Sequence, residues 1–240
     1  MKISVIIPTL NEEHTVEKTL RQIRSHLTDF DHEIIVTDSG STDRTVAIAK
    51  RYGQVVVDAS PAHTIASNKN NGARLAHGEY LVFIDADVFV PDPNAFFKIA
   101  LSNFGKDKKL VAITANLMVF PETATRMDNI VFTLVNLDHW FNNNVTHTGS
   151  ASGEFQMIKR TAFEAVHGYQ KHLAVAEDND MFRRLAKIGH TRIERRLTVY
   201  HTGRRAHEIG WAHVLWDWGI NYFSVRLFNR SYNKEWKAIR

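Results

Sequence analysis

Tyr80-Leu-Val-Phe-Ile-Asp-Ala-Asp87 is the stretch of sequence that decides the fold. Its apolar run predicts a buried strand, and its end places two carboxylates where that strand opens into a loop. Such hard oxygen ligands bind Mg²⁺ or Mn²⁺, ions that also bridge substrate phosphates. Ligands of an α/β sheet are expected at the carboxyl ends of its strands. The stretch therefore indicates a site for a phosphorylated substrate, with helix capping as the alternative role of the two carboxylates.

Strand and helix patterns alternate through the first half of the chain. Apolar runs predict strands at residues 3–8, 33–37, 55–58, 80–84 and 110–114, and helical spacing predicts helices at 13–27, 41–52 and 65–76. This order predicts an α/β fold with a parallel, doubly wound sheet and helices on both faces. The loops at residues 8–12 and 38–43 then lie at carboxyl strand ends and line one crevice.

From Ala115 onward the pattern changes. We predict a long helix at 123–142, a loop of small residues at 146–153, a strand at 155–159, helices that begin at Thr161 and Glu177, and a last strand at 197–200. The last strand ends at His201, which is a candidate metal ligand through a neutral imidazole, or a structural histidine.

Composition narrows the possible classes. The 240 residues are 44% hydrophobic, which fits one globular fold, with or without an appendage. The absence of cysteine excludes disulfides and thiol catalysis. The net charge of +4 and the arginines from residue 183 onward favour the binding of phosphate groups, either on a nucleotide or on an anionic membrane. No nucleic-acid motif accompanies the charge, so nucleic acid is not an expected partner. We expect neither a signal peptide nor a membrane-spanning helix.

The tail at residues 207–240 holds four of the five tryptophans. Helical spacing puts apolar side chains on one stripe: Trp211, Leu215, Trp218, Tyr222 and Val225. Polar side chains fall on the opposite stripe: His213, Asp217, Asn221 and Ser224. The pattern suits a helix in a membrane interface, or one that packs on the domain or on a second chain. Because amphipathic helices mostly face cores, it favours packing.

Several charged residues are candidates for substrate binding. Asp38 ends an apolar strand beside a Gly/Ser turn, so it either accepts hydrogen bonds from a nucleoside or caps the next helix; Asp43 fits the capping role better. Lys69 and Arg74 precede the Asp85 strand, and Arg suits phosphate, although a surface ion pair is the alternative.

Glu177 and Asp178, followed by Asp180, begin a predicted helix. A carboxylate beside another in a dry cleft has its pKa raised and can act as a general base. The alternative is a favourable charge at a helix N-terminus.

Four motifs occur in the order that is typical of one family. They are Ile6-Ile-Pro-Thr-Leu-Asn-Glu-Glu13, Val36-Thr-Asp-Ser-Gly-Ser-Thr-Asp43, Asn71-Gly-Ala-Arg with Gly78-Glu-Tyr-Leu-Val-Phe-Ile-Asp-Ala-Asp87, and Ala176-Glu-Asp-Asn-Asp-Met-Phe-Arg-Arg184. Over residues 3–203 the chain resembles a family 2 glycosyltransferase of the GT-A fold. The resemblance implies a nucleotide-binding half at 1–114, an acceptor half at 115–203 and a basic aromatic extension at 204–240.

The resemblance also implies an inverting transferase that uses a nucleotide-sugar donor, a divalent cation (Mn²⁺ or Mg²⁺) and a glycan or lipid-linked acceptor, as in cell-envelope polysaccharide synthesis. The roles implied for the donor site fall on Pro8, Thr9, Asn11, Glu12, Asp38, Lys69, Arg74, Asp85, Ala86 and Arg184. The metal ligands would be Asp85, Asp87 and His201, and Asp178 would be the base, with Glu177 supporting it. The resemblance makes uridine the expected nucleoside of the donor. We expect a cytoplasmic protein, and peripheral binding to the inner face of the membrane through 207–240 stays open as the alternative to packing of the tail; the oligomeric state also stays open.

Two features depart from the family pattern. Thr37 stands where a second acidic residue is usual, and Gly153-Glu-Phe-Gln156 maps to no substrate. Two alternatives stay open: an aspartyl-phosphate phosphatase with Asp85 as nucleophile, and a binding scaffold without turnover.

Overall fold

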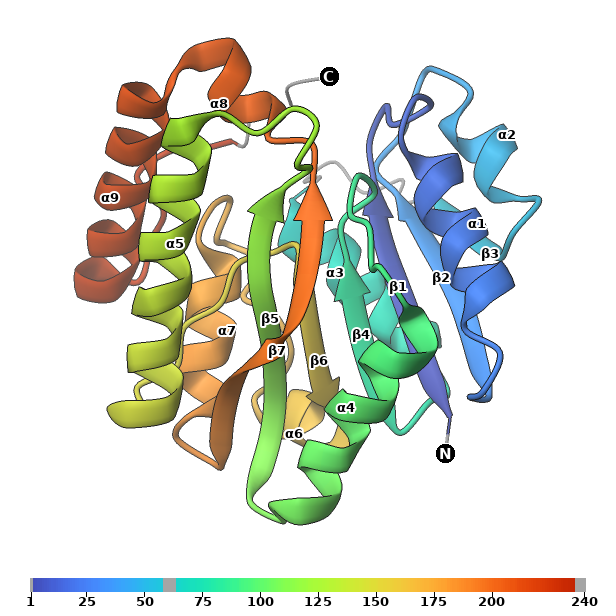
Figure 1. The fold of residues 1–240 in the computed structure, drawn as a ribbon, viewed down its shortest axis with the longest axis horizontal. Coiled ribbons are helices and arrows are strands. Elements are labelled where there is room, and N and C mark those ends of the chain that lie inside the picture. Colours follow the sequence, from blue (N-terminus) through green and yellow to red (C-terminus); the bar gives the residue numbers. More distant parts are fainter. Residues whose placement is uncertain (1, 58–63, 236–240) are drawn as a thin grey trace.

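The computed structural model describes residues 2–57 and 64–235, and its centre is a seven-stranded sheet in the order β3-β2-β1-β4-β6-β5-β7 (Figure 1). The strands are β1 Ile3–Thr9, β2 His32–Asp38, β3 Gln54–Val57, β4 Tyr80–Ile84, β5 Leu110–Val119, β6 Phe155–Lys159 and β7 His190–His201. The main helices are α1 Val16–His26, α2 Thr45–Ala49, α3 Ile65–Leu75, α4 Pro93–Lys106, α5 Arg126–Trp140, α6 Arg160–Ala165, α7 Glu177–Leu185, α8 Arg204–Ile209 and α9 Trp211–Phe228.

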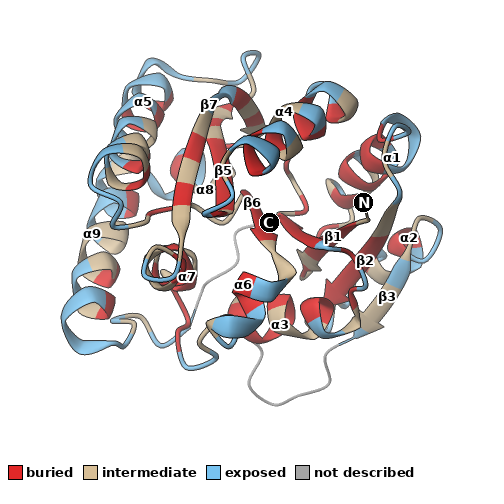
Figure 2. Ribbon diagram, turned by 90° about the horizontal axis from the view of Figure 1, so that it is seen from below, coloured by how far each residue is buried: buried red, intermediate tan, exposed pale blue. Residues whose placement is uncertain are grey.

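Helices cover both faces of the sheet, as the alternating pattern predicts. One buried cluster joins the strands to α1, α2 and α4, and a second joins them to α3, α6 and α7. The strands are therefore buried between two helical layers, which Figure 2 shows as red ribbon inside paler helices. Such burial explains why β4 is apolar at every position rather than alternating.

The sheet is mostly parallel but not wholly so. β6 runs antiparallel to both of its neighbours, β4 and β5. The mostly parallel sheet that the GT-A resemblance implies is therefore confirmed, and β6 is its antiparallel strand. The apolar pattern of β6 does not reveal its direction, because the direction depends on the path of the preceding chain. The antiparallel β6 brings the loop before it, residues 150–154, to the carboxyl end of β4.

Two elements differ further from the predictions. The sequence patterns did not predict α4, whose start is marked by Asp92 accepting a hydrogen bond from the Ala95 N–H and by Pro93 in the first turn. β7 begins at His190, seven residues before the predicted strand, and pairs with β5 through a register shift. The end of the third predicted strand, Asp58, lies outside the described residues, as does Trp236.

The tail helix α9 packs on the domain beside α5. Phe132 of α5 lies edge-to-face against Trp211 and Trp218, with ring centroids 5.4 and 6.4 Å apart. The predicted stripes are wrong at two positions. Asn221 is buried, because its amide oxygen accepts the Tyr232 and Asn233 N–H groups, whereas Leu215 is 46% exposed. None of the described helices is both long and apolar enough to cross a bilayer.

Candidate active site

A cavity of about 1030 Å³ opens at the carboxyl ends of β1 and β4. Its walls come from the loops after these strands, the 150–154 loop, the start of α7, the end of β7, and helices α5, α8 and α9. This is the position expected for a ligand of an α/β sheet. The volume lies at the upper end of the range of about 300–1000 Å³ that is usual for a small-molecule site.

The two carboxylates after β4 lie in this cavity. Asp85 is half-buried in the wall of the cavity, and loss of hydration raises its pKa to about 8, against the lowering effect of the Lys69 charge. Asp87 accepts a hydrogen bond from Thr202 Oγ1 at 2.6 Å, and Arg204 Nε lies 3.8 Å from the same oxygen. Strand β4 therefore delivers Asp85 to the interior and Asp87 to the rim formed by the end of β7.

His201 lines the same cavity, as the metal-ligand hypothesis requires. Burial lowers its pKa to about 4, so the ring is neutral at pH 7. The Gly203 N–H points at Nδ1 from 3.3 Å, and the buried Nε2 has no hydrogen-bond partner among the described residues. Because Nδ1 accepts from the Gly203 N–H, the single proton of the neutral ring lies on Nε2. Binding of a metal through Nε2 would require that proton to move to Nδ1, which would break the Gly203 contact.

Within residues 2–57 and 64–235, no three His, Asp or Glu side chains are assembled as a metal site. Asp85, Asp87 and His201 therefore do not form a preassembled three-ligand cage. The arrangement fits an ion that keeps waters and takes its other oxygens from a substrate diphosphate, as Mg²⁺ commonly does.

The predicted base lies at the N-terminus of α7, beside a buried lysine. Lys69 Nζ of α3 lies 2.6 Å from Asp178 Oδ1 and 3.2 Å from Glu177 Oε1, and only 1% of its side chain is exposed. Burial alone would lower the pKa of Lys69, but the two carboxylate charges raise it well above its usual value. Burial and the Asp178 charge raise the pKa of Glu177 to about 8. Lys69 thus pairs with the two carboxylates at the start of α7 instead of standing free for a phosphate.

Two residues that the sequence did not map complete this cluster. Gln156 Nε2 donates to Asp178 Oδ1 at 3.0 Å and its Oε1 accepts from the Tyr169 hydroxyl at 2.5 Å. Glu154 is buried, its Oε2 has no partner in the described part of the chain, and burial raises its pKa to about 7. The sequence offered a weak signal for both residues, since Glu154 lies directly before β6 and Gln156 is a polar residue within it.

Gly153 lies where the metal and base carboxylates converge. A Cβ added there would lie 2.8 Å from Asp178 Oδ2 and 3.4 Å from Asp85 Oδ2. Both oxygens therefore approach one point on the wall of the cavity. A side chain at residue 153 would occupy the space between the candidate metal ligand and the candidate base.

The residues predicted to hold the nucleoside divide into two groups. Pro8, Thr9, Glu12 and Ala86 line the cavity. Asp38 is fully buried, and it accepts hydrogen bonds from its own loop and from β1: Thr9 Oγ1 at 2.9 Å, Gly40 N at 3.0 Å and Ser41 N at 2.8 Å. Its carboxylate therefore shapes the loops around the site.

Three further predicted residues are not among the cavity-lining residues. Asn11 ties two loops together by accepting the Thr42 N–H at 2.8 Å. Arg74 is exposed. Arg184 Nε pairs with Asp180 Oδ2 at 2.7 Å, a carboxylate of its own helix. Asn68, which was not a predicted site residue, lines the cavity with a buried Oδ1 that has no partner among the described residues.

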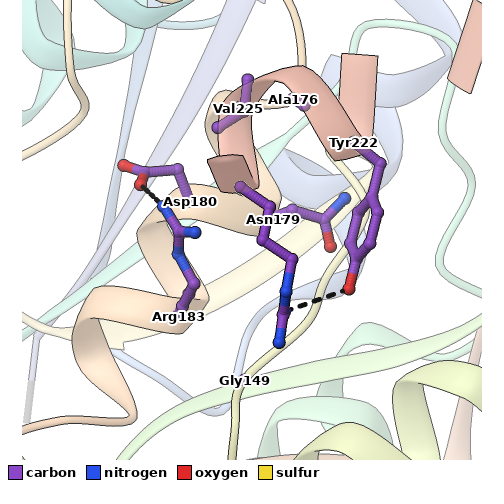
Figure 3. A pocket seen from close by; sticks show the side chains of 8 residues that line it. Gly149, Ala176, Asn179, Asp180, Arg183, Tyr222 and Val225 are labelled. Carbon is purple, nitrogen blue, oxygen red and sulfur yellow. Dashed lines mark hydrogen bonds and ion pairs between the residues drawn. The ribbon is translucent and has the colours of Figure 1, made fainter. Parts of the chain in front are cut away.

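A second pocket lies between α7 and α9 (Figure 3). Asn179 and Tyr222 line it, with the Arg183–Asp180 ion pair at 2.9 Å on one side and the Arg226–Tyr222 hydrogen bond at 3.3 Å on the other. Its volume of about 20 Å³ accommodates about one water molecule. The large cavity is therefore the candidate active site.

The fold and the carboxylate-rich cavity at its strand ends define a glycosyltransferase of the GT-A type. The pattern of one family, described as "Glycosyl transferase family 2", matches residues 4–167. The chain belongs to this family, as its four motifs predicted.

Relatives with established names support the same family. Chondroitin synthase of Pasteurella multocida (strain Pm70) is 28% identical over 194 residues, covering 78% of this chain and 19% of that protein. Succinoglycan biosynthesis protein ExoA of Rhizobium meliloti (strain 1021) is 28% identical over 195 residues, covering 78% of this chain and 58% of that protein. The chain thus spans less than two thirds of the length of each of these relatives.

Solved structures share the fold. A mannosyltransferase from Pyrobaculum calidifontis in complex with GDP-Man and Mn²⁺ has a TM-score of 0.74 at 20% identity, covering 99% of this chain and 65% of that one. Glucosyl-3-phosphoglycerate synthase from Mycobacterium tuberculosis, with Mn²⁺ and UDP-Glc among its ligands, has a TM-score of 0.59 at 22% identity. The match covers 87% of this chain and 74% of that one. At these identities the likeness shows the fold, which confirms the predicted GT-A architecture.

Proposed function

We propose that the chain is an inverting glycosyltransferase, which moves a sugar from a nucleotide-sugar donor to a hydroxyl of a glycan or lipid-linked acceptor. The observation that carries the proposal is the convergence of Asp85 Oδ2 and Asp178 Oδ2 on Gly153. A transferase needs the leaving phosphate and the attacking hydroxyl to meet at one carbon, and the two carboxylates are placed to serve these two groups. The uridine nucleotides remain the first donors to test.

The charges in the cavity fit a divalent cation. Burial raises the pKa values of three carboxyl groups in the cavity: Asp85, Glu154 and Glu177. Lys69 is a buried cation beside Glu177 and Asp178. A buried negative excess is costly unless protons or a cation neutralise it. Asp85 and Asp87 would hold Mn²⁺ or Mg²⁺ there, with His201 as a further candidate. The bound ion would stabilise the negative charge on the departing diphosphate.

Asp178 is the proposed general base. Lys69 and Gln156 hold its Oδ1, which fixes the orientation of the carboxylate. Oδ2, beside Gly153, takes the proton of the acceptor hydroxyl as that oxygen bonds to the anomeric carbon. The bond from this carbon to the phosphate breaks on the opposite face, so the configuration inverts. Base assistance of this kind contributes about 10²–10⁴-fold to the rate. Membership of the family removes the phosphatase alternative, and turnover separates an enzyme from a scaffold.

The experiment that tests the proposal has two steps. A thermal-shift screen of UDP, GDP, TDP and CDP with and without Mn²⁺ identifies the nucleotide, since a selective ligand stabilises the fold by mass action. Release of nucleoside diphosphate from the matching nucleotide sugar, with a panel of acceptors, then measures turnover. Asp178→Asn should keep the thermal shift and lose transfer. Transfer by this variant at the wild-type rate would contradict the base assignment.

Peripheral membrane binding, on the cytoplasmic side, is a separate proposal about α9. Trp216, Phe223 and Phe228 are 61–69% exposed, and Arg226 and Arg230 are exposed near them. Exposed aromatic residues with neighbouring arginines suit an anionic lipid surface. Replacing Trp216 and Phe223 by Ser should reduce sedimentation with phosphatidylglycerol vesicles. Equal sedimentation of the variant and the wild type would count against this surface.

A further inference from the structure

His139 is a buried cavity residue that the reaction described above does not use. It lies near the end of α5, is 6% exposed, and lines the large cavity. Its Nδ1 lies 2.8 Å from Ser150 Oγ. Its Nε2, the ring nitrogen farther from the backbone, is buried and has no hydrogen-bond partner among residues 2–57 and 64–235. A buried polar atom without a partner costs free energy unless a ligand or water satisfies it.

The hydrogen-bond network fixes which nitrogen carries the proton. The Ala151 N–H can only donate, and it points at Asn179 Oδ1 from 3.4 Å, which identifies that atom as the amide oxygen. Ser150 Oγ lies 2.8 Å from the same oxygen and must donate to it. The one hydroxyl proton is then used, so Ser150 Oγ accepts from His139 Nδ1. Nδ1 therefore carries the proton of the neutral ring.

With Nδ1 protonated, Nε2 presents a lone pair. Burial lowers the pKa of His139 to about 4, so the ring is neutral at pH 7 and Nε2 is an acceptor. Its missing partner must be a donor, such as a hydroxyl. The site is built for a group that offers O–H, because the three residues of the network leave Nε2 no alternative proton.

His139 lies on the acceptor side of the cavity. The loops that would bind the nucleotide follow β1 and β2, whereas α5 lies on the other side of β4 and β6 in Figure 1. The network that fixes His139 includes Asn179, which directly follows the proposed base Asp178. α5 also contributes the apolar Phe132, Leu134 and Val135 to the cavity wall, and Asp138 Oδ2 lies 3.8 Å from His139 Nδ1. A mostly apolar wall with a few placed polar atoms is typical of sites that orient one ligand.

We propose that His139 Nε2 accepts a hydrogen bond from a hydroxyl of the acceptor sugar, and that Ser150 and Asn179 position it by holding the proton on Nδ1. The inference rests on the proposed function and names its acceptor as a carbohydrate. It assigns His139 as an acceptor-binding residue and Ser150 as a positioning residue. The sugar of the donor also carries hydroxyl groups. The experiment therefore distinguishes a hydroxyl of the acceptor from one of the donor.

The test observes the ring directly. The ¹⁵N-histidine-labelled chain is recorded in long-range ¹H–¹⁵N spectra, in which protonated and unprotonated ring nitrogens are distinct, and His139→Gln assigns the signals. The probes are methyl glycosides of glucose, mannose, N-acetylglucosamine and rhamnose, added with UDP or GDP and Mn²⁺. UDP-glucose, UDP-N-acetylglucosamine and GDP-mannose are added separately without a glycoside.

We expect the neutral Nδ1–H form at pH 7 and a shift of the Nε2 signal with at least one glycoside. An Nε2 signal unmoved by every glycoside would mean that water alone satisfies the atom, and it would overturn the proposal. A shift produced by a nucleotide sugar alone would assign the hydroxyl to the donor and would also overturn it. If no nucleotide stabilises the chain in the thermal-shift screen, the proposed function fails independently.

Variants add an affinity measurement. His139→Phe keeps a ring but removes the acceptor, so it should weaken glycoside binding about 10-fold and leave nucleotide stabilisation unchanged. Ser150→Ala should change the ratio of His139 tautomers, a readout that a purely structural role of Ser150 would not produce. His77→Phe is the control, since its side chain is 74% exposed and it lies before β4, at the opposite edge of the sheet. Equal glycoside affinity of His139→Phe and the wild type would refute the assignment.

Discussion

Gly153→Ala should disable transfer while leaving the fold and the donor site intact. The new Cβ would lie 2.8 Å from Asp178 Oδ2, whereas ordinary contacts of a Cβ begin near 3.4 Å, so the carboxylate must move by about 0.6 Å. The contact is with the end of a side chain, and Gly153 does not have a positive φ, so the backbone tolerates alanine. The cost in stability should therefore stay within about 1 kcal/mol.

The effect on the reaction should be larger. A misplacement of about 1 Å can cost about 10²-fold in rate, so a shift of this size predicts a loss of roughly 10-fold to 10²-fold. Thermal unfolding with nucleoside diphosphate and Mn²⁺ measures donor binding, and nucleoside diphosphate release measures turnover. Gly105→Ala in α4 is a matched control, because no atom lies within 4 Å of its added Cβ. Wild-type turnover by Gly153→Ala, with normal donor binding, would refute the convergence of the two carboxylates as the reacting centre.

Three further changes probe the carboxylates. Asp87→Ala should abolish Mn²⁺-dependent nucleotide stabilisation and turnover, and a variant that keeps both would exclude Asp87 as a ligand. Without metal, the protein should lose stability as the pH rises from about 6.5 to 8, because Asp85, Glu154 and Glu177 have folded pKa values of about 7–8 and hold protons that the unfolded chain has already released. The loss is roughly 1.4 kcal/mol per pH unit for each of these groups that still holds its proton in the folded state, and it levels off as the pH passes the folded pKa. Mn²⁺ should reduce the loss, and melting curves in chelator across this range check the sign. Glu154→Gln should make the metal-free protein more stable at pH 8 than the wild type, and a lower melting temperature at that pH would contradict the buried-charge account.

Much of the fold could be predicted because its strands are locally distinctive. β4 and β6 begin and end at the predicted residues; β4 is a short apolar run bounded by turn residues, and β6 follows the small-residue loop that ends at Gly153. The antiparallel direction of β6 could not be predicted, because it depends on contacts with β4 and β5 that are distant in sequence. α4 was predictable in principle, from the Asp92-Pro93 start and the buried Phe96, Ala100 and Phe104 that follow at helical spacing.

The sequence motifs identified candidate residues that line the cavity. They did not identify the contacts that arise when distant parts of the chain pack together. The motifs located Asp85, Asp87 and Asp178, all of which line the cavity. The pairing of Lys69 with Asp178 joins residues 109 positions apart, so sequence spacing alone could not distinguish it from a phosphate contact. The partners of Asn221 lie in the turn after α9, which the helical stripe did not include.

The contact between Arg204 and Glu12 ties the last part of the chain to the first. Arg204 of α8 lies 2.5 Å from Glu12 Oε1 and 3.8 Å from Asp87, while α8 leads directly into α9. A ligand whose phosphates drew Arg204 away from Glu12 would move the first residue of α8, and α8 ends one residue before α9 begins. If that movement altered how α9 binds a surface, the surface would alter donor affinity by the same factor, because coupling between two binding events is reciprocal.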